Sequence, residues 1–180
     1  MPGRLRVLNS RTLYSGRIVE LTLDRVIEPG GVTADREVVR HGGSVVVVPH
    51  LPDGRLVLVR QYRYAARRWL WELVAGSLEP GETPRAAARR ELLEETGYRA
   101  RSTKLLRDFY SSPGFLSERM FLVEARGLTR SKAQPEEDER IEVGCFSQAQ
   151  LIRMFHHQQI RDGKTLVGIL LLLCRAHAWF

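Results

Sequence analysis

The segment of residues 76–98 constrains this chain most, because a loop containing glycine leads directly into a helix that carries several glutamates. Thr83 is a favourable N-cap, Pro84 suits the first helical position, and alanines with high helix propensity follow. Gly97 supplies the left-handed residue that commonly ends a helix. These signals predict a helix of about fourteen residues over positions 83–96, immediately after the loop.

The predicted helix gathers carboxylates on one face. Residues three and four positions apart on a helix are neighbours, so Glu91, Glu94 and Glu95 lie close together. Such a cluster repels itself unless a cation is present, and Mg²⁺ prefers carboxylate oxygens, retains water and reaches substrate phosphates. A solvated charged face is the more common reason for this pattern on a helix rich in Glu and Arg. From these residues alone, a magnesium site and a solvated face both remain open.

The length and the apolar pattern predict one main domain with a small N-terminal appendage, since 180 residues at 43% hydrophobic content bury one substantial core but divide poorly into two. Alternation of apolar and polar residues predicts half-buried strands at 18–27 and 34–40. Runs of β-branched residues predict buried strands at 44–49 and 56–62. The Pro-Asp-Gly turn signal at 52–54 predicts that these two buried strands form a hairpin.

Strand and helix signals continue to the end of the chain. Strands are expected at 104–110, 120–125 and 141–146, an acidic loop at 134–140, and helices at 148–156 and 164–178. This order predicts an α/β layered sandwich preceded by an antiparallel N-terminal β layer.

Composition disfavours several classes of protein. The apolar run from Leu166 to Cys174 is too short to cross about 30 Å of hydrocarbon, and the N-terminus lacks an apolar signal core, so no membrane protein is expected. Cys145 and Cys174 form no CxxC pair, which favours a reducing cytoplasm over a disulfide framework or zinc site. The net charge of +7 suits either a nucleic acid or a small anionic substrate and does not decide between them. A nucleic-acid partner is not expected, because the arginines spread from Arg4 to Arg175 form no basic stripe with interleaved aromatic residues.

The sequence GSLEPGETPRAAARRELLEETGY at 76–98 resembles the Nudix box. Gly76, Glu82 and the run from Arg90 to Gly97 stand at the spacing of that motif, while Tyr98 stands where an aliphatic residue is commoner. The resemblance implies a Nudix-type α/β/α sandwich with a mixed sheet, in addition to the small N-terminal antiparallel β layer.

The resemblance extends to QYR at 61–63 and WELVAG at 71–76, which look like the approach to the box in ADP-ribose pyrophosphatases. It implies that Arg63 binds the substrate diphosphate, for which an arginine fork is well suited, and that Glu72 contacts the substrate or a metal-bound water. The alternatives are an ion pair at a strand end for Arg63 and a solvated carboxylate for Glu72. Pro113 follows the box at a distance where a proline resembles the one that marks this subfamily. It would shape a rigid loop beside the nucleotide.

The resemblance also implies ligands for Mg²⁺, for which Mn²⁺ could substitute. The Ala75 carbonyl, Glu91 and Glu95 would hold the ions. Glu82 would bind a further ion or support the box, and Glu94 would complete the shell through waters. These ions would neutralise the phosphates, activate water for attack on one phosphorus and stabilise the leaving oxygen.

The acidic run PEEDER at 135–140 resembles the mobile loop that delivers the general base in ADP-ribose pyrophosphatases. Alignment of the strand that follows points to Glu139 as the base and to Glu137 as the second candidate. A carboxylate at that place could take a proton from water. An ordinary solvated charged loop is the alternative, and the sequence leaves the two open.

The implied reaction is Mg²⁺-dependent hydrolysis of ADP-ribose to AMP and ribose 5-phosphate. GDP-mannose, FAD and UDP-sugars are the alternative substrates. An ADP-ribose-binding regulator is the non-enzymatic alternative, although such regulators typically lose the box carboxylates, which this sequence retains. The resemblance also implies a homodimer, in which residues 1–42 form a β segment for dimerisation and residues 43–180 form the hydrolase domain.

Overall fold

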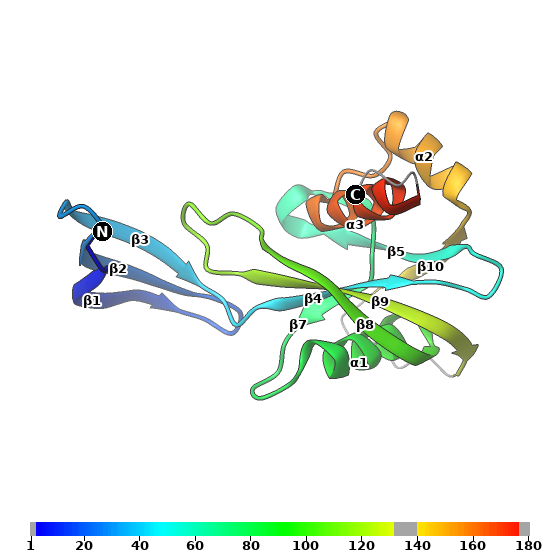
Figure 1. Ribbon diagram of the computed structural model, residues 1–180, viewed down its shortest axis with the longest axis horizontal. Coiled ribbons are helices and arrows are strands. Elements are labelled where there is room, and N and C mark those ends of the chain that lie inside the picture. Colours follow the sequence, from blue (N-terminus) through cyan, green and yellow to red (C-terminus); the bar gives the residue numbers. More distant parts are fainter. Residues whose placement is uncertain (1–2, 132–139, 177–180) are drawn as a thin grey trace. The chain divides into compact units, whose positions relative to one another are not determined.

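The computed structural model describes residues 3–131 and 140–176. Figure 1 shows its helices and strands. Within the described residues, no helix is long and apolar enough to cross a membrane. The chain forms two compact units, one from residues 1–43 and 110–119 and the other from residues 44–109 and 120–180.

The first unit is built on a three-stranded antiparallel sheet in the order β1-β2-β3. Its strands are β1 (Arg6–Ser15), β2 (Glu20–Ile27) and β3 (Thr33–Arg40). β2 forms as predicted, but its buried face carries Thr22, Asp24 and Val26, whereas the alternating leucines Leu21 and Leu23 are only half-buried. The sequence does not predict β1, because all ten of its residues are exposed and its apolar residues do not alternate.

The second unit contains two sheets. In the sheet β7-β4-β9-β8, β4 runs parallel to β9 and antiparallel to β7, whereas the sheet β10-β5-β6 is antiparallel. The bounds are β4 (Ser44–Pro49), β5 (Leu56–Arg63), β6 (Arg68–Glu72), β7 (Ala75–Ser77), β8 (Tyr98–Tyr110), β9 (Arg119–Arg130) and β10 (Glu142–Phe146), with a short 3-10 helix at Tyr64–Ala66.

Helices cover both faces of the β4 sheet (Figure 1). They are α1 (Pro84–Thr96), α2 (Gln148–His156) and α3 (Gly163–Ala176). Val45 and Val47 of β4 share one hydrophobic core with Leu92 of α1. Val46 and Val48 belong to the other core, together with residues of α2 and α3. Since β4 is buried on both faces, a continuous β-branched run suits it. The predicted α/β/α sandwich with a mixed sheet is confirmed.

The predicted hairpin of the strands at 44–49 and 56–62 is wrong. β4 and β5 belong to different sheets, and an isolated bridge between His50 and Leu56 is what links them. β9 pairs with β4 from Ser44 to Pro49 and β7 pairs with it from Ser44 to Val46, so these two strands, and not β5, are the neighbours of β4 in its sheet. The turn at 52–54 forms as predicted, but it carries the chain from one sheet to the other.

α1 begins and ends where the sequence predicts. Thr83 Oγ1 accepts a hydrogen bond from the Ala86 N–H at 3.3 Å, and Pro84 is the first helical residue. Gly97 follows the helix with φ 70° and donates its N–H to the Leu93 carbonyl at 2.9 Å. These caps set which residues of the helix lie next to the preceding loop.

Candidate active site

Arg90 lies among the glutamates of α1 and its preceding loop. Its Nη2 donates to Glu82 Oε2 at 2.8 Å, and its Nη1 donates to Glu91 Oε1 at 2.7 Å and to Glu94 Oε2 at 3.2 Å. The hydrogen bond with Glu82 is the largest cause that raises the pKa of Arg90, and the same bond lowers the pKa of Glu82. One guanidinium thus holds three of the box carboxylates together and partly neutralises them.

Gly76 brings the backbone of β7 against Glu91. A Cβ atom at position 76 would lie 1.9 Å from Glu91 Oε1 and 2.0 Å from its carboxyl carbon. Antiparallel pairing, in which Val45 faces Gly76 and Val46 faces Ala75, fixes this part of the loop. A residue with a side chain therefore cannot replace Gly76 without displacing the carboxylate.

The predicted ligands on β7 and α1 have the chemistry of a magnesium site. Glu91 and Glu95 are both buried, Ala75 adds a main-chain carbonyl, and all of these donors are oxygen atoms. In the part of the chain that the structure describes, the His, Cys, Asp and Glu side chains form no group of three that could hold a metal ion as they stand. The fit therefore rests on donor chemistry and on the close approach at Gly76, and the ligand assignments stay predictions.

Arg63, at the end of β5, forms a bidentate ion pair with Glu72, at the end of β6. Arg63 Nε and Nη2 donate to the two carboxylate oxygens at 2.9 and 2.7 Å, and Lys164 Nζ contacts the same carboxylate. Burial acts to raise the pKa of Glu72, but the hydrogen bonds and charges of Arg63 and Lys164 outweigh it, and the pKa is lowered. Glu72 is fully buried and so is no solvated carboxylate, whereas the Arg63 side chain is 41% exposed.

A network at the start of α3 holds Lys164 in this contact. Lys164 Nζ also donates to Asp162 Oδ1 at 2.9 Å, and Asp162 Oδ2 accepts from the Thr165 N–H at 2.9 Å and from its hydroxyl at 2.6 Å. Thr165 Oγ1 in turn accepts from the Leu73 N–H at 2.8 Å, next to Glu72. Sequence reasoning missed these partners, because only the Asp-Gly-Lys-Thr run at a predicted helix start could have signalled them.

Pro113 belongs to the first unit, where the segment 110–119 turns at Ser112, whose carbonyl accepts from the Phe115 N–H at 3.3 Å. Both candidate bases, Glu137 and Glu139, lie outside the described residues. The predicted site residues that the structure brings into contact are Arg63 with Glu72, and Glu82, Glu91 and Glu94 through Arg90.

Comparison with known proteins gives consistent matches along most of the chain. A methanol dehydrogenase activator from Bacillus methanolicus is 36% identical over 91% of this chain and 90% of its own length. ADP-ribose pyrophosphatases from Bacillus subtilis (strain 168) and Mycobacterium tuberculosis are 34% and 37% identical over 91% of this chain, and over 90% and 80% of theirs. The crystal structure of an ADP compounds hydrolase matches with a TM-score of 0.83 at 21% identity, over 98% of this chain and 97% of that one, which shows the same fold.

The family model for the NUDIX domain matches residues 40–166. That range contains the Arg63–Glu72 pair, Gly76 and the whole of α1. The chain therefore belongs to the NUDIX family.

Proposed function

We propose that this NUDIX protein hydrolyses the diphosphate bond of ADP-ribose and releases AMP and ribose 5-phosphate. The observation that carries the proposal is the approach of the Glu91 carboxylate to the Gly76 backbone, because diphosphate hydrolysis needs oxygen donors for divalent cations beside the substrate. The relatives named ADP-ribose pyrophosphatases, at 34% and 37% identity over 91% of this chain, support ADP-ribose as the substrate.

Nudix hydrolases generally depend on divalent metal ions, and we assign Mg²⁺, with Mn²⁺ as a substitute, to this chain. The Ala75 carbonyl, Glu91 and Glu95 would hold it. Glu82 would bind a further ion or support the loop, and Glu94 would take part through water. When bound, the metal would neutralise the phosphates and lower the pKa of a water molecule.

The other parts of the reaction fall to side chains of the protein. Arg63 would bind the diphosphate through N–H groups that Glu72 leaves unused, since this ion pair occupies Nε and Nη2 of a guanidinium with further donors. Water would form a bond to one phosphorus while the bridging P–O bond breaks. Glu139, with Glu137 as the second candidate, would accept the proton of that water. Pro113 would shape the loop beside the nucleotide.

The proposal includes a homodimer, in which residues 1–42 form the dimerisation element and residues 43–180 the hydrolase domain. It is supported by the large apolar side chains that β1 exposes, namely Val7, Leu8, Leu13 and Tyr14. Burying them against a second copy would remove apolar surface from water. We place the protein in the cytoplasm, in keeping with its two free cysteines.

A second candidate function comes from the relative from Bacillus methanolicus, whose name describes activation of methanol dehydrogenase. Its 36% identity over 91% of this chain is similar to that of the pyrophosphatases. Activation of a dehydrogenase is therefore the alternative to test. Hydrolysis is favoured because the chain keeps all four box carboxylates, Glu82, Glu91, Glu94 and Glu95.

A substrate panel tests the proposal. ADP-ribose, GDP-mannose, FAD and UDP-glucose are each incubated with Mg²⁺, and the products are separated by ion-exchange chromatography. We expect the highest kcat/KM with ADP-ribose, with AMP and ribose 5-phosphate in equal amounts. Glu91→Gln is assayed in the same way and should lose turnover. Glu28→Gln is its matched control, because Glu28 pairs with Arg36 in the first unit. If another substrate of the panel gives the highest kcat/KM, that substrate replaces ADP-ribose in the proposal. If none is hydrolysed, the proposed hydrolase function is overturned, and activation of methanol dehydrogenase becomes the function to assay.

A further inference from the structure

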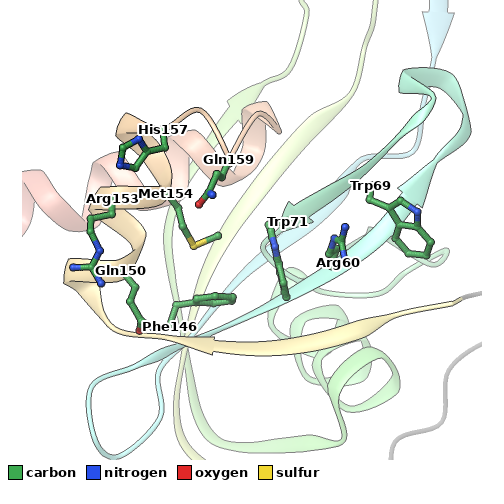
Figure 2. A pocket seen from close by; sticks show the side chains of 9 residues that line it. All are labelled: Arg60, Trp69, Trp71, Phe146, Gln150, Arg153, Met154, His157 and Gln159. Carbon is green, nitrogen blue, oxygen red and sulfur yellow. The ribbon is translucent and has the colours of Figure 1, made fainter.

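A pocket of about 670 Å³ lies between α2 and the β10-β5-β6 sheet (Figure 2). Its volume falls within the range of about 300–1,000 Å³ that small-molecule sites occupy. Its aromatic side chains come from the sheet, its polar and basic ones come from α2, the residues just after α2 and Arg60 of β5, and none of the described residues that line it is acidic. The pocket therefore combines flat apolar surfaces with positive charge.

The floor of the pocket is aromatic. The rings of Trp71 and Phe146 meet edge to face, with centroids 4.8 Å apart and an interplanar angle of 79°. A Cβ atom at Gly144 would lie 2.5 Å from the Phe146 ring and 2.8 Å from the Trp71 ring, so glycine at this position makes room for the pair. Figure 2 shows Trp71, Phe146 and Met154 facing one another, with Trp69 farther along the sheet. These surfaces suit a planar ring.

The rim of the pocket is polar and basic. α2 presents Gln150 and Arg153 to it, and His157, the residue that follows the helix, also lines the pocket. Arg153 and His157 are exposed, and among the described residues neither forms an ion pair with a carboxylate. Arg60, by contrast, stacks 5.4 Å above the Trp69 ring and pairs with a glutamate of β10. Arg153 and His157 are therefore the groups left for an anion.

The pocket and the proposed catalytic groups use opposite faces of the same strands. Trp71 and Glu72 are successive residues of β6, so their side chains point to opposite faces. Arg60 and Arg63 are three positions apart in β5, which also places them on opposite faces. The lining residues include none of the groups assigned to metal or diphosphate binding.

We propose that this pocket binds a purine nucleoside monophosphate as a second nucleotide site. The base would pack on Trp69 and Trp71, and the phosphate would lie at Arg153 and His157 on the opposite side. Aromatic side chains hold bases through their faces, while a guanidinium binds a phosphate through paired N–H donors. The inference does not depend on the reaction proposed above.

AMP and GMP titrations of the full chain in EDTA, measured by isothermal titration calorimetry, test this proposal. We expect saturable binding that is lost when Trp69 and Trp71 are both changed to Ala. Arg153→Gln should weaken binding about tenfold or more, since it removes a charge-assisted contact. Arg161→Gln is the matched control, because Arg161 is exposed and lines no part of the pocket. Arg63→Ala should leave the titration unchanged.

Circular dichroism of each variant separates loss of the site from loss of the fold. Absence of binding by both nucleotides, or equal weakening in Arg153→Gln and Arg161→Gln, would overturn the proposal. So would a titration that Arg63→Ala abolishes, because the nucleotide would then occupy the site on the other face. Equal affinity for ribose 5-phosphate and AMP would show that the aromatic floor contributes nothing, which also contradicts it.

Discussion

Replacing Lys164 by Met tests the buried network that fixes Glu72 and, through it, Arg63. Glu72 is fully buried and the Lys164 side chain is only 10% exposed, so the variant leaves a buried carboxylate with one cationic partner in place of two. Removing one partner of a buried ion pair costs about 3–5 kcal/mol. Because Arg63 still neutralises Glu72, we expect the low end, about 3 kcal/mol of unfolding free energy. For a protein of this size that lowers Tm by about 6–12 °C.

The loss should depend on pH in a defined direction. The folded-state pKa of Glu72 is lowered, so its ionic contacts contribute stability above the unfolded pKa of glutamate, and this contribution disappears as pH falls through the lowered folded value. In Lys164→Met the burial of Glu72 is opposed less, and its carboxylate takes up a proton at higher pH. The difference in unfolding free energy between the two proteins is therefore greatest near pH 7 and shrinks toward acid pH.

Urea unfolding at a series of pH values measures this difference. Arg25→Met is the control, since the pair of Arg25 with Asp35 has side chains 53% and 52% exposed and should contribute at most about 1 kcal/mol. The role of Lys164 in stabilising Glu72 is refuted if Lys164→Met costs no more unfolding free energy than the control at pH 7. It is equally refuted if the difference stays constant as pH falls.

Three further substitutions test the proposed site. Gly76→Ala should lower kcat/KM by about a hundredfold with little change in Tm, because its Cβ would displace the Glu91 carboxylate; unchanged kinetics would contradict this. Arg63→Ala should raise KM more than it lowers kcat if the arginine binds ground and transition states alike, and an unchanged substrate affinity would remove its diphosphate role. Glu139→Gln should lower kcat by about two to four orders of magnitude, and near-normal rates in both Glu139→Gln and Glu137→Gln would exclude the acidic loop from the mechanism.

The sequence predicted those helices whose ends are set by residues within the helix or next to it. α1 has a hydroxyl cap, a proline and a left-handed glycine within its own sequence, and it occupies the predicted positions. The hairpin prediction for β4 and β5 failed because strand pairing is decided by which distant strands reach the edges of β4, namely β7 and β9. Neither β7, with three residues, nor exposed β1 carries an apolar pattern of its own.

In the candidate site, too, the sequence predicted the local features and not the contacts between distant residues. Motif spacing pointed to the glutamates of α1, and the structure adds that Arg90 holds three of them together. The contact of Lys164 with Glu72 joins residues 92 positions apart, and no local pattern marks such a pair. It arises because the start of α3 lies against the end of β6, where Thr165 also binds the Leu73 N–H.

The assignment of the α1 carboxylates is tested most directly by product formation from ADP-ribose by the wild-type chain and by Glu91→Gln, each over a range of Mg²⁺ concentrations. We predict AMP and ribose 5-phosphate in equal amounts from the wild type, no turnover without the metal, and loss of turnover in a Glu91→Gln protein that keeps its Tm. Near-normal turnover by Glu91→Gln at limiting Mg²⁺ would contradict the assignment of the α1 carboxylates as the catalytic centre.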